Sequence, residues 1–137
     1  MFLNEKEAWL NKIYQASSHL LPFLEFKSFF LQYFSFDQKP FIITVGGTNG
    51  KGSVVGLLEH TLVNSGVSVL VNTSPHLQDY NERVKLNGVS IKDDLLIEGF
   101  EYIDECAKKQ GIQLGFAHYA FLLACYVAKI EMPEILI

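Results

Sequence analysis

The feature that most constrains the fold is a glycine-rich segment that joins an apolar run to a helical pattern. Residues 41–45 (FIITV) are apolar or β-branched and lead directly into residues 46–53 (GGTNGKGS). Apolar residues then recur at helical spacing until Ser65 and Gly66 end the pattern. A buried strand, a glycine turn and a helix present backbone N–H groups and a helix N-terminus to a phosphate chain. The segment therefore predicts a phosphate-binding loop.

Each residue type in this loop suits a phosphate ligand. Glycines at positions 46, 47, 50 and 52 let the backbone approach phosphate oxygens closely. Lys51 supplies a point charge for the β- and γ-phosphates, and the Ser53 hydroxyl can reach a phosphate or a magnesium ion. The match to the general pattern G-x-x-x-x-G-K-[ST] is imperfect, because Val45 occupies the first glycine position and Gly52 separates Lys51 from Ser53. The alternative is a turn that is glycine-rich for steric reasons alone.

The composition is that of one folded domain. With 137 residues, 49% of them hydrophobic and 19% charged, the chain can bury a core and is not of the disordered class. The net charge of −4, with Lys and Arg scattered, gives no reason to expect a nucleic-acid partner. Cys106 and Cys125, without an N-terminal export signal, indicate reduced, buried thiols in a cytoplasmic protein. Residues 114–130 are strongly apolar but contain His118 and are short for a membrane span, so we expect a buried helix and no membrane partner.

The N-terminal part of the chain has the pattern of a helical segment. Residues 5–21 place apolar side chains on one broad face. Residues 23–36 are dense in aromatic side chains, whose spacing favours core packing over a ligand platform. A turn signal then precedes the apolar run. We therefore expect a helical segment over residues 1–40 and an incomplete ATP-binding domain over residues 41–137.

A second strand is expected over residues 67–71, beyond the loop helix. Two apolar strands joined by a helix form a βαβ unit, in which the strands are parallel and the crossover is right-handed. Ser74 and His76 then lie at the carboxyl end of a parallel strand, where open α/β sheets bind ligands. The alternative for His76 is an exposed loop histidine without a function. The other expected elements are a hairpin over residues 84–91, helices over residues 93–109 and 116–129, and a buried strand over residues 134–137.

Three segments together carry a resemblance to a known family. They are residues 47–53, residues 74–77 (SPHL), and Glu82-Arg83-Val84 followed by Asn87-Gly88. Their order and spacing resemble folylpolyglutamate synthase/dihydrofolate synthase, a branch of the Mur ligase superfamily. The resemblance covers residues 41–137 well and the N-terminal part only loosely. It implies an α/β fold with a P-loop-type parallel sheet flanked by helices, the first part of a Mur-ligase-like ATPase domain, with the chain ending in mid-domain.

The resemblance also implies an activity, that of an ATP- and Mg²⁺-dependent carboxylate–amine ligase of folate biosynthesis and one-carbon metabolism. In such an enzyme the carboxylate of folate or dihydropteroate attacks the γ-phosphate, and the amine of L-glutamate then displaces phosphate from the acyl phosphate. Charge on the transferring phosphoryl group must be neutralised, and this is the catalytic role implied for Lys51. The implied contacts are Gly47, Thr48, Asn49, Gly50, Lys51, Gly52 and Ser53 for ATP, Ser53 and Ser74 for the metal, and His76, Leu77, Arg83, Phe116 and His118 for the folate-side substrate.

Two departures from the family pattern bear on these expectations. The family has an aromatic-aromatic-Glu segment at the start of the long helix, whereas residues 116–119 are Phe-Ala-His-Tyr, so His118 stands where a glutamate is expected. A carboxylate accepts two hydrogen bonds from a pterin and a neutral imidazole only one, so His118 either binds pterin or has a structural role. The chain also ends at Ile137, before the family's Glu-Val-Gly-Leu-Gly-Gly segment and its C-terminal domain. We therefore expect this chain to be inactive without the missing C-terminal half.

Three functions remain open from the sequence. The chain is the N-terminal part of a folate ligase, a nucleotide-binding protein without ligase turnover, or a protein of another group. That other group is a different Mur-type amide ligase, or a P-loop switch or kinase. The first is favoured because all three segments agree with it. We expect a cytoplasmic monomer whose ligands are ATP, L-glutamate and folate or dihydropteroate, and the sequence leaves the choice between the last two open.

Overall fold

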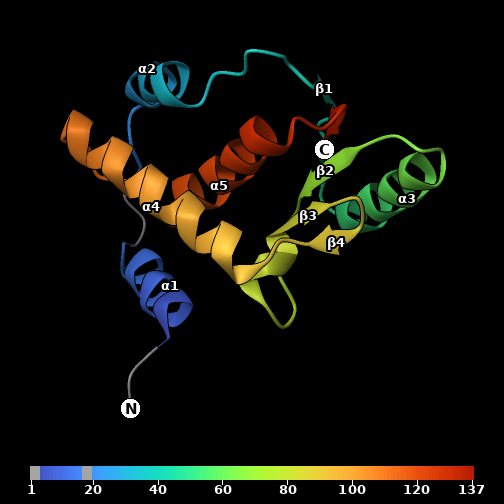
Figure 1. Ribbon diagram of the computed structural model, residues 1–137, viewed down its shortest axis with the longest axis horizontal. Coiled ribbons are helices and arrows are strands. Elements are labelled where there is room, and N and C mark those ends of the chain that lie inside the picture. Colours follow the sequence, from blue (N-terminus) through green and yellow to red (C-terminus); the bar gives the residue numbers. More distant parts are fainter. Residues whose placement is uncertain (1–3, 17–19) are drawn as a thin grey trace.

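A mixed sheet with helices on both faces organises the structure. In residues 4–16 and 20–137, which the computed structural model describes, five strands lie in the order β1-β5-β2-β3-β4. Helix α3 covers one face of the sheet, α5 covers the other, and α4 packs against α5 (Figure 1). The elements are α1 (Glu5–Gln15), α2 (Phe23–Tyr33), β1 (Phe41–Ile42), α3 (Lys51–Asn64), β2 (Val69–Asn72), the 3₁₀ helix η1 (Tyr80–Arg83), β3 (Val84–Leu86), β4 (Val89–Ser90), α4 (Asp93–Gln110), α5 (Phe116–Glu131) and β5 (Ile135–Leu136).

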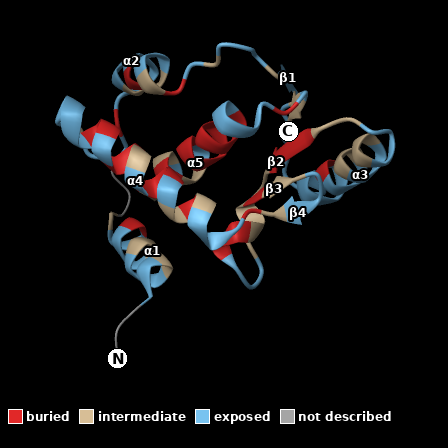
Figure 2. Ribbon diagram, in the orientation of Figure 1, coloured by how far each residue is buried: buried red, intermediate tan, exposed pale blue. Residues whose placement is uncertain are grey.

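Strand β2 contributes side chains to two hydrophobic clusters, one on each face of the sheet. Its Leu70 belongs to the large core formed with α4 and α5. Val69 and Val71 instead form a smaller cluster with Val55 of α3. Successive side chains of a strand point to opposite faces of the sheet, so this alternation buries both faces of β2 (Figure 2).

The parallel arrangement expected from the βαβ pattern is confirmed. Strands β1 and β2 both pair in parallel with β5, which lies between them. The hairpin expected over residues 84–91 is also confirmed, because β3 and β4 pair antiparallel and β3 pairs antiparallel with β2. Its turn has Asn87 at φ 51° and Gly88 at φ 81°, the positive values that a tight hairpin turn requires. The sheet is thus parallel through β1, β5 and β2 and antiparallel at the hairpin.

The first strand is shorter and more exposed than its apolar sequence predicts. Strand β1 contains only Phe41 and Ile42, which are 70% and 56% exposed. It lies at the edge of the sheet and pairs with β5 on one side. The prediction of a buried strand over residues 41–45 is therefore wrong, because the edge position decides the exposure of these side chains. Strand β5, also expected to be buried, is half-buried.

The two N-terminal helices both end earlier than predicted. Helix α1 begins after Asn4, whose Oδ1 accepts the N–H of Glu7 at 2.8 Å, and ends at Gln15 rather than at residue 21. Of the predicted remainder, residues 17–19 lie outside the described residues, and residues 20 and 21 are not helical. Helix α2 ends at Tyr33 rather than at residue 36, because Phe34 adopts φ −121° and is fully buried. The proposed division of the chain at residue 40 stays a prediction.

Helix α4 packs closely against α5. The residues expected to face inward on α4 are all buried, which confirms the predicted face: Leu96, Phe100, Ile103 and Ala107. Gly99 permits the close approach of the two helices, since a Cβ at this position would lie 2.5 Å from Leu123 Cδ1 and 3.1 Å from Tyr126 Cδ1. The backbone separation of α4 and α5 therefore depends on glycine at position 99.

Helix α5 is the buried helix expected over the apolar run, and it holds one of the two cysteines. Cys125 on α5 and Cys106 on α4 are both buried free thiols, as predicted. Burial raises the pKa of Cys125 to about 12, so the thiol stays protonated at neutral pH. In the part of the chain that the structure describes, no helix combines the length and hydrophobicity of a membrane span.

Candidate functional site

The end of the glycine loop, where the helix begins, is built as the sequence predicts. Helix α3 starts at Lys51, and Gly50 before it has φ 80°, a conformation that favours glycine. The N–H of Val54 donates to the Gly50 carbonyl at 3.0 Å. The N–H groups of residues 51–53 lie ahead of this bond at the open end of the helix, and no side chain caps that end. This arrangement can accept an anion.

The presence of glycine at positions 46 and 52 of the loop is explained neither by backbone conformation nor by packing. Gly47 has φ 147°, whereas Gly46 and Gly52 do not have positive φ values. A Cβ at Gly46 or at Gly52 would meet no atom within 4 Å. The protein itself therefore has room for a side chain at both positions. The glycines keep the space beside the loop open, as the approach of an external group would require.

The two side chains expected to meet phosphate and metal lie at the open end of α3. The Lys51 ammonium group donates to the carbonyl oxygen of Gly47, so the side chain folds back across its own loop. Lys51 and Ser53 are both exposed. The ammonium group is thus held over the loop by a single backbone acceptor, which a phosphate oxygen can replace.

Glu82 determines the shape of the loop that follows β2. Its carboxylate accepts the backbone N–H groups of Leu77, Gln78 and Asp79 at 2.8, 3.0 and 2.8 Å. These hydrogen bonds, that from Leu77 foremost, lower the pKa of Glu82. Because Glu82 lies beside Arg83 in η1, the same carboxylate fixes the loop relative to the arginine.

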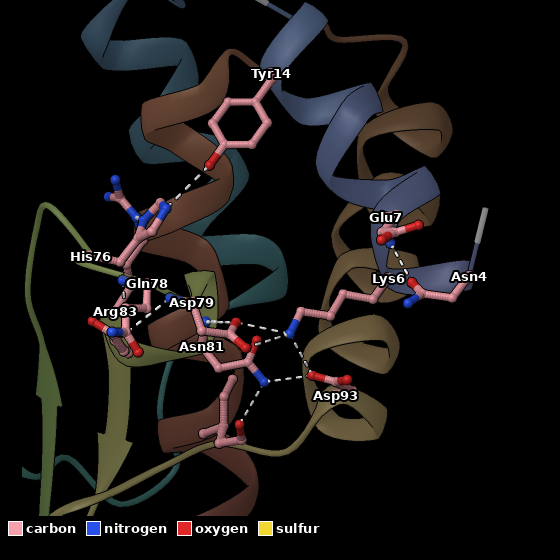
Figure 3. Close-up of polar contacts among 12 residues, drawn as sticks. Asn4, Lys6, Glu7, Tyr14, His76, Gln78, Asp79, Asn81, Arg83 and Asp93 are labelled. Atoms are coloured by element: carbon pink, nitrogen blue, oxygen red, sulfur yellow. Dashed lines mark hydrogen bonds and ion pairs between the residues drawn. The ribbon is translucent and has the colours of Figure 1, made fainter.

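Arg83 lies within a group of rings from three parts of the chain. Its Nε donates to His76 Nδ1 at 2.8 Å, and its Cζ lies 5.2 Å from the Tyr80 ring centroid and 5.1 Å from that of Phe116. Tyr14 reaches in from α1, with its hydroxyl 3.4 Å from His76 Nε2 (Figure 3). Burial raises the pKa of Tyr80, so a neutral phenol faces the guanidinium group. The rings hold the cation in a fixed orientation.

Beside this group lies a cavity of about 470 Å³ at the carboxyl end of β2. A second, smaller cavity shares two of its lining residues, Asn72 and Phe121, and extends to Thr44 and Val45 at the start of the glycine loop. The residues that lead into the glycine loop and the loop that follows β2 therefore line adjoining cavities at the carboxyl ends of β1 and β2, as expected from the parallel strands. The larger cavity is lined by Asn72, Thr73, Ser74, Pro75, Arg83, Phe116, Ala117, Ala120 and Phe121.

The structure brings some of the predicted substrate residues together and separates others. Ser74, Arg83 and Phe116 line the same cavity. His76 is not among the residues that line this cavity. It accepts the hydrogen bond from Arg83 and, with Tyr14, lines a neighbouring groove. The Leu77 side chain is 91% exposed and is outside the lining of the cavity. Its backbone N–H, held by Glu82, has the clearer structural role.

His118 interacts with its own helix and with α2. Its Nδ1 accepts the backbone N–H of Gly115 at 3.0 Å, as a cap at the start of α5. Its ring packs on that of Phe26, with the centroids 4.9 Å apart. His118 is not among the residues that line the 470 Å³ cavity. These contacts give the ring a packing and capping role, and its part in ligand binding stays a prediction.

Sequence reasoning missed the residues by which α1 contacts the loop. Lys6 Nζ lies 2.8 Å from Asp79 Oδ1 and 2.8 Å from Asp93 Oδ1 (Figure 3). The hydrogen bond from Lys6 lowers the pKa of Asp79. Tyr14, eight residues further along α1, lies with its hydroxyl 3.4 Å from His76 Nε2. In the sequence these residues form only part of an amphipathic helix, and the fold alone places them beside the loop.

Relatives of known sequence cover most of this chain. The dihydrofolate synthase/folylpolyglutamate synthase of Haemophilus influenzae is 50% identical over 93 residues, which are 68% of this chain and 21% of the relative. The protein of the same name from Escherichia coli is 35% identical over 98 residues, 72% of this chain and 23% of the relative. The chain thus spans about a fifth of the length of these curated relatives. No protein-family model matches the chain.

Solved structures agree in fold over nearly all of the chain. A bifunctional folylpolyglutamate synthase/dihydrofolate synthase with Mn, AMPPNP and L-glutamate bound has a TM-score of 0.84 at 29% identity, covering 96% of this chain and 32% of that one. Escherichia coli FolC in complex with DHPP and ADP gives 0.84 at 29% identity, with coverage of 96% and 32%. A folylpolyglutamate synthetase from Lactobacillus casei gives 0.87 at 20% identity, covering 96% and 35%, which shows the fold alone.

The mixed sheet, its flanking helices and these superpositions define a Mur-ligase-like α/β domain. Within this class, the chain belongs to the dihydrofolate synthase/folylpolyglutamate synthase family. The family expected from residues 47–53, 74–77 and 82–88 is therefore confirmed, and its named members are ligases.

Proposed function

We propose that this chain supplies the nucleotide loop and part of the carboxylate-substrate pocket of an ATP-dependent ligase that adds L-glutamate to folate or dihydropteroate. The observation that carries the proposal is the common position of two features. The cavity lined by Arg83 shares Asn72 and Phe121 with a second cavity, which is lined by Thr44 and Val45, the residues that lead into the glycine loop, and by Val55 of α3. A phosphate donor and a carboxylate acceptor have to meet at one place for phosphoryl transfer. We place this ligase in the cytoplasm, as a monomer.

The nucleotide loop is proposed to extend from Gly47 to Ser53. The uncapped helix end, the positive φ of Gly50 and the open space beside Gly46 and Gly52 all suit a phosphate chain. Solved relatives with AMPPNP or ADP bound support a nucleotide at this kind of domain. Lys51 would exchange the Gly47 carbonyl for phosphate oxygens and stabilise charge on the γ-phosphoryl group as it transfers.

Arg83 is proposed to bind the carboxylate-bearing substrate. Its Nε is engaged by His76, and within the described residues no hydrogen bond occupies its terminal nitrogens. Arginine pairs with carboxylates through two parallel N–H donors. Phe116 and Phe121, with the small Ala117 and Ala120 between them, offer apolar surface for a flat ring system.

The reaction we propose proceeds in two steps with a balanced transfer of groups. A carboxylate oxygen of the folate-side substrate attacks the γ-phosphorus, and the bond to the β-phosphate oxygen breaks to release ADP. The amine of L-glutamate then attacks the acyl carbon, phosphate leaves, and the amine loses a proton as the amide forms. Lys51 and the α3 amides would neutralise the first transition state, and Arg83 would hold the substrate in line for it.

The described residues fit a magnesium ion that is bound together with the nucleotide. No group of three or more His, Cys, Asp and Glu side chains in residues 4–16 and 20–137 is arranged to hold a metal. Ser53 and Ser74 offer hydroxyl oxygens, and Mg²⁺ in phosphate sites takes few protein ligands beside phosphate and water. When bound, the ion would neutralise charge on the transferring phosphoryl group. We therefore propose Ser53 and Ser74 as contributors to a site completed by other oxygens.

We further propose that this chain alone binds nucleotide without completing the ligation. It spans about a fifth of the length of its ligase relatives. This share favours a requirement for further parts of the enzyme, including the C-terminal half expected from the family. Nucleotide binding without turnover is thus the second candidate function for the chain by itself.

Calorimetric titration of the purified chain with AMPPNP and Mg²⁺, and separately with dihydropteroate, tests these proposals. We expect binding of both ligands, and a loss of about tenfold or more in AMPPNP affinity for Lys51→Ala. Lys27→Ala is the matched control, because Lys27 is an exposed lysine on α2. Equal AMPPNP affinity of Lys51→Ala and the wild type would contradict the role of Lys51. Glutamate-dependent ADP release by the chain alone would contradict its proposed inactivity.

A further inference from the structure

Tyr14 of α1 makes two contacts with the side chains around Arg83, here called the Arg83 group: Arg83 itself, His76, Tyr80 and Phe116. Its ring stacks on that of Phe116, with centroids 5.2 Å apart and an angle of 16° between the planes. Its hydroxyl lies 3.4 Å from Nε2 of His76, which stands between Tyr14 and the Arg83 side chain (Figure 3). Helix α1 thus contacts Phe116 directly and Arg83 through His76, and both of these residues line the 470 Å³ cavity.

The arginine determines the direction of the hydrogen bonds in this chain of side chains. The Nε of Arg83 is always a donor, so Nδ1 of His76 must offer its lone pair to it. A neutral imidazole then carries its hydrogen on Nε2 and can donate only to the Tyr14 oxygen. The order Arg83, His76, Tyr14 is therefore a directed sequence of donors and acceptors, in which each side chain orients the next.

Helix α1 is held in place independently of Tyr14. The Lys6 ammonium group donates to both carboxylate oxygens of Asp79, at 2.8 and 3.0 Å, and to Asp93 Oδ1 at 2.8 Å. Asp79 belongs to the same loop as His76 and adjoins η1, which carries Arg83. The position of the Tyr14 hydroxyl relative to His76 is consequently fixed at a second point, at the other end of α1.

We propose that Tyr14 is a positioning residue for the carboxylate-binding arginine. By holding the His76 ring, it fixes the plane of the Arg83 guanidinium group, so that the unpaired terminal nitrogens face a substrate carboxylate in the cavity. The substrate in this statement rests on the proposed function, whereas the link from Tyr14 to Arg83 does not. Tyr14 then determines preference for a carboxylate-bearing ligand over the same ring system without a carboxylate.

The test uses Tyr14→Phe, which keeps the ring stacked on Phe116 and removes only the hydroxyl. Solvent exchange of the Arg83 Nε–H, measured by NMR without any ligand, should become about fivefold faster in this variant. Tyr33→Phe, which removes a tyrosine hydroxyl on α2, is the matched control and should leave the exchange unchanged. An unchanged exchange rate in Tyr14→Phe would overturn the proposal. His76→Asn supplies the second background, because Asn retains an acceptor but is too short to reach Tyr14, and Tyr14→Phe should then have no added effect.

Ligand binding distinguishes positioning from simple packing. Tyr14→Phe should weaken dihydropteroate binding by about fivefold and leave the binding of its decarboxylated analogue, 6-anilinomethyl-7,8-dihydropterin, unchanged. Equal loss for both ligands, or for neither, would overturn the role in carboxylate preference. Failure of the wild-type chain to bind dihydropteroate would overturn the proposed function, and the exchange measurement would still decide the link from Tyr14 to Arg83.

Discussion

Lys6 donates to both carboxylate oxygens of Asp79, at 2.8 and 3.0 Å, and thereby joins the N-terminal helix to the loop that follows β2. The same ammonium group also reaches Asp93 at the start of α4. Burial alone would lower the pKa of Lys6, but the hydrogen bonds to Asp79 and Asp93 outweigh it and raise the pKa. Helix α1, the loop after β2 and the start of α4 are thus connected through one cation.

Replacement of Lys6 should loosen this connection. Lys6→Met keeps most of the aliphatic chain but leaves the carboxylates of Asp79 and Asp93 near each other without their shared cation. We expect a loss of about 1 kcal/mol in the free energy of unfolding, measured by urea denaturation. Lys27→Met, at an exposed position on α2, is the control and should change little. Equal stability of the two variants would mean that the Lys6 contacts contribute nothing in solution.

The loop held by Glu82 should respond to acid. The pKa of Glu82 is lowered from 4.5 by the backbone N–H groups it accepts, so the folded state favours its ionised form. The stabilisation is then complete above pH 4.5 and is lost as the pH falls through the lower pKa of the folded state. Protection of the Leu77 and Asp79 amides from hydrogen exchange should fall in that range. In Glu82→Gln these amides should be poorly protected at neutral pH, and full protection there would contradict the argument.

A pair of helix glycines should respond oppositely to alanine. Gly99→Ala places a Cβ 2.5 Å from Leu123 Cδ1, and the overpacking should cost about 1–3 kcal/mol of unfolding free energy. Gly56 lies on α3, where a Cβ would meet no atom within 4 Å, so Gly56→Ala should gain about 0.5–1 kcal/mol through helix propensity. Thermal unfolding of the two variants measures both signs. A stabilised Gly99→Ala would show that α4 and α5 are further apart than described.

Much of the fold could be predicted because local patterns carry it. The four inward residues of α4 follow helical spacing, and Asn87-Gly88 specifies a tight hairpin turn. The predictions of this helix and of the hairpin were therefore correct. The exposure of Phe41 and Ile42 could not be predicted, because an apolar run does not reveal whether its strand lies at the edge of a sheet. The end of α2 was missed for a similar reason, since Phe34 leaves the helix to reach a core formed by distant residues.

The candidate site shows the same division between local and distant information. The start of α3 at Lys51 follows from the glycine turn, a local signal. The contact between Tyr14 and His76 joins residues 62 positions apart, and no spacing in the sequence indicates it. His118 was left undecided between two roles, and its hydrogen bond with Gly115 and its contact with Phe26 depend on where α5 begins and where α2 packs.

Gly52→Ala shows whether the glycine loop binds a phosphate chain. A side chain at position 52 meets no protein atom within 4 Å, so the variant should fold with unchanged or slightly higher thermal stability. Its affinity for AMPPNP and Mg²⁺, measured by calorimetric titration, should nevertheless fall by about tenfold or more, because the Cβ occupies space kept for the nucleotide. Unchanged stability with weakened binding is the predicted result. A Gly52→Ala variant that is folded and binds AMPPNP as tightly as the wild type would contradict the account.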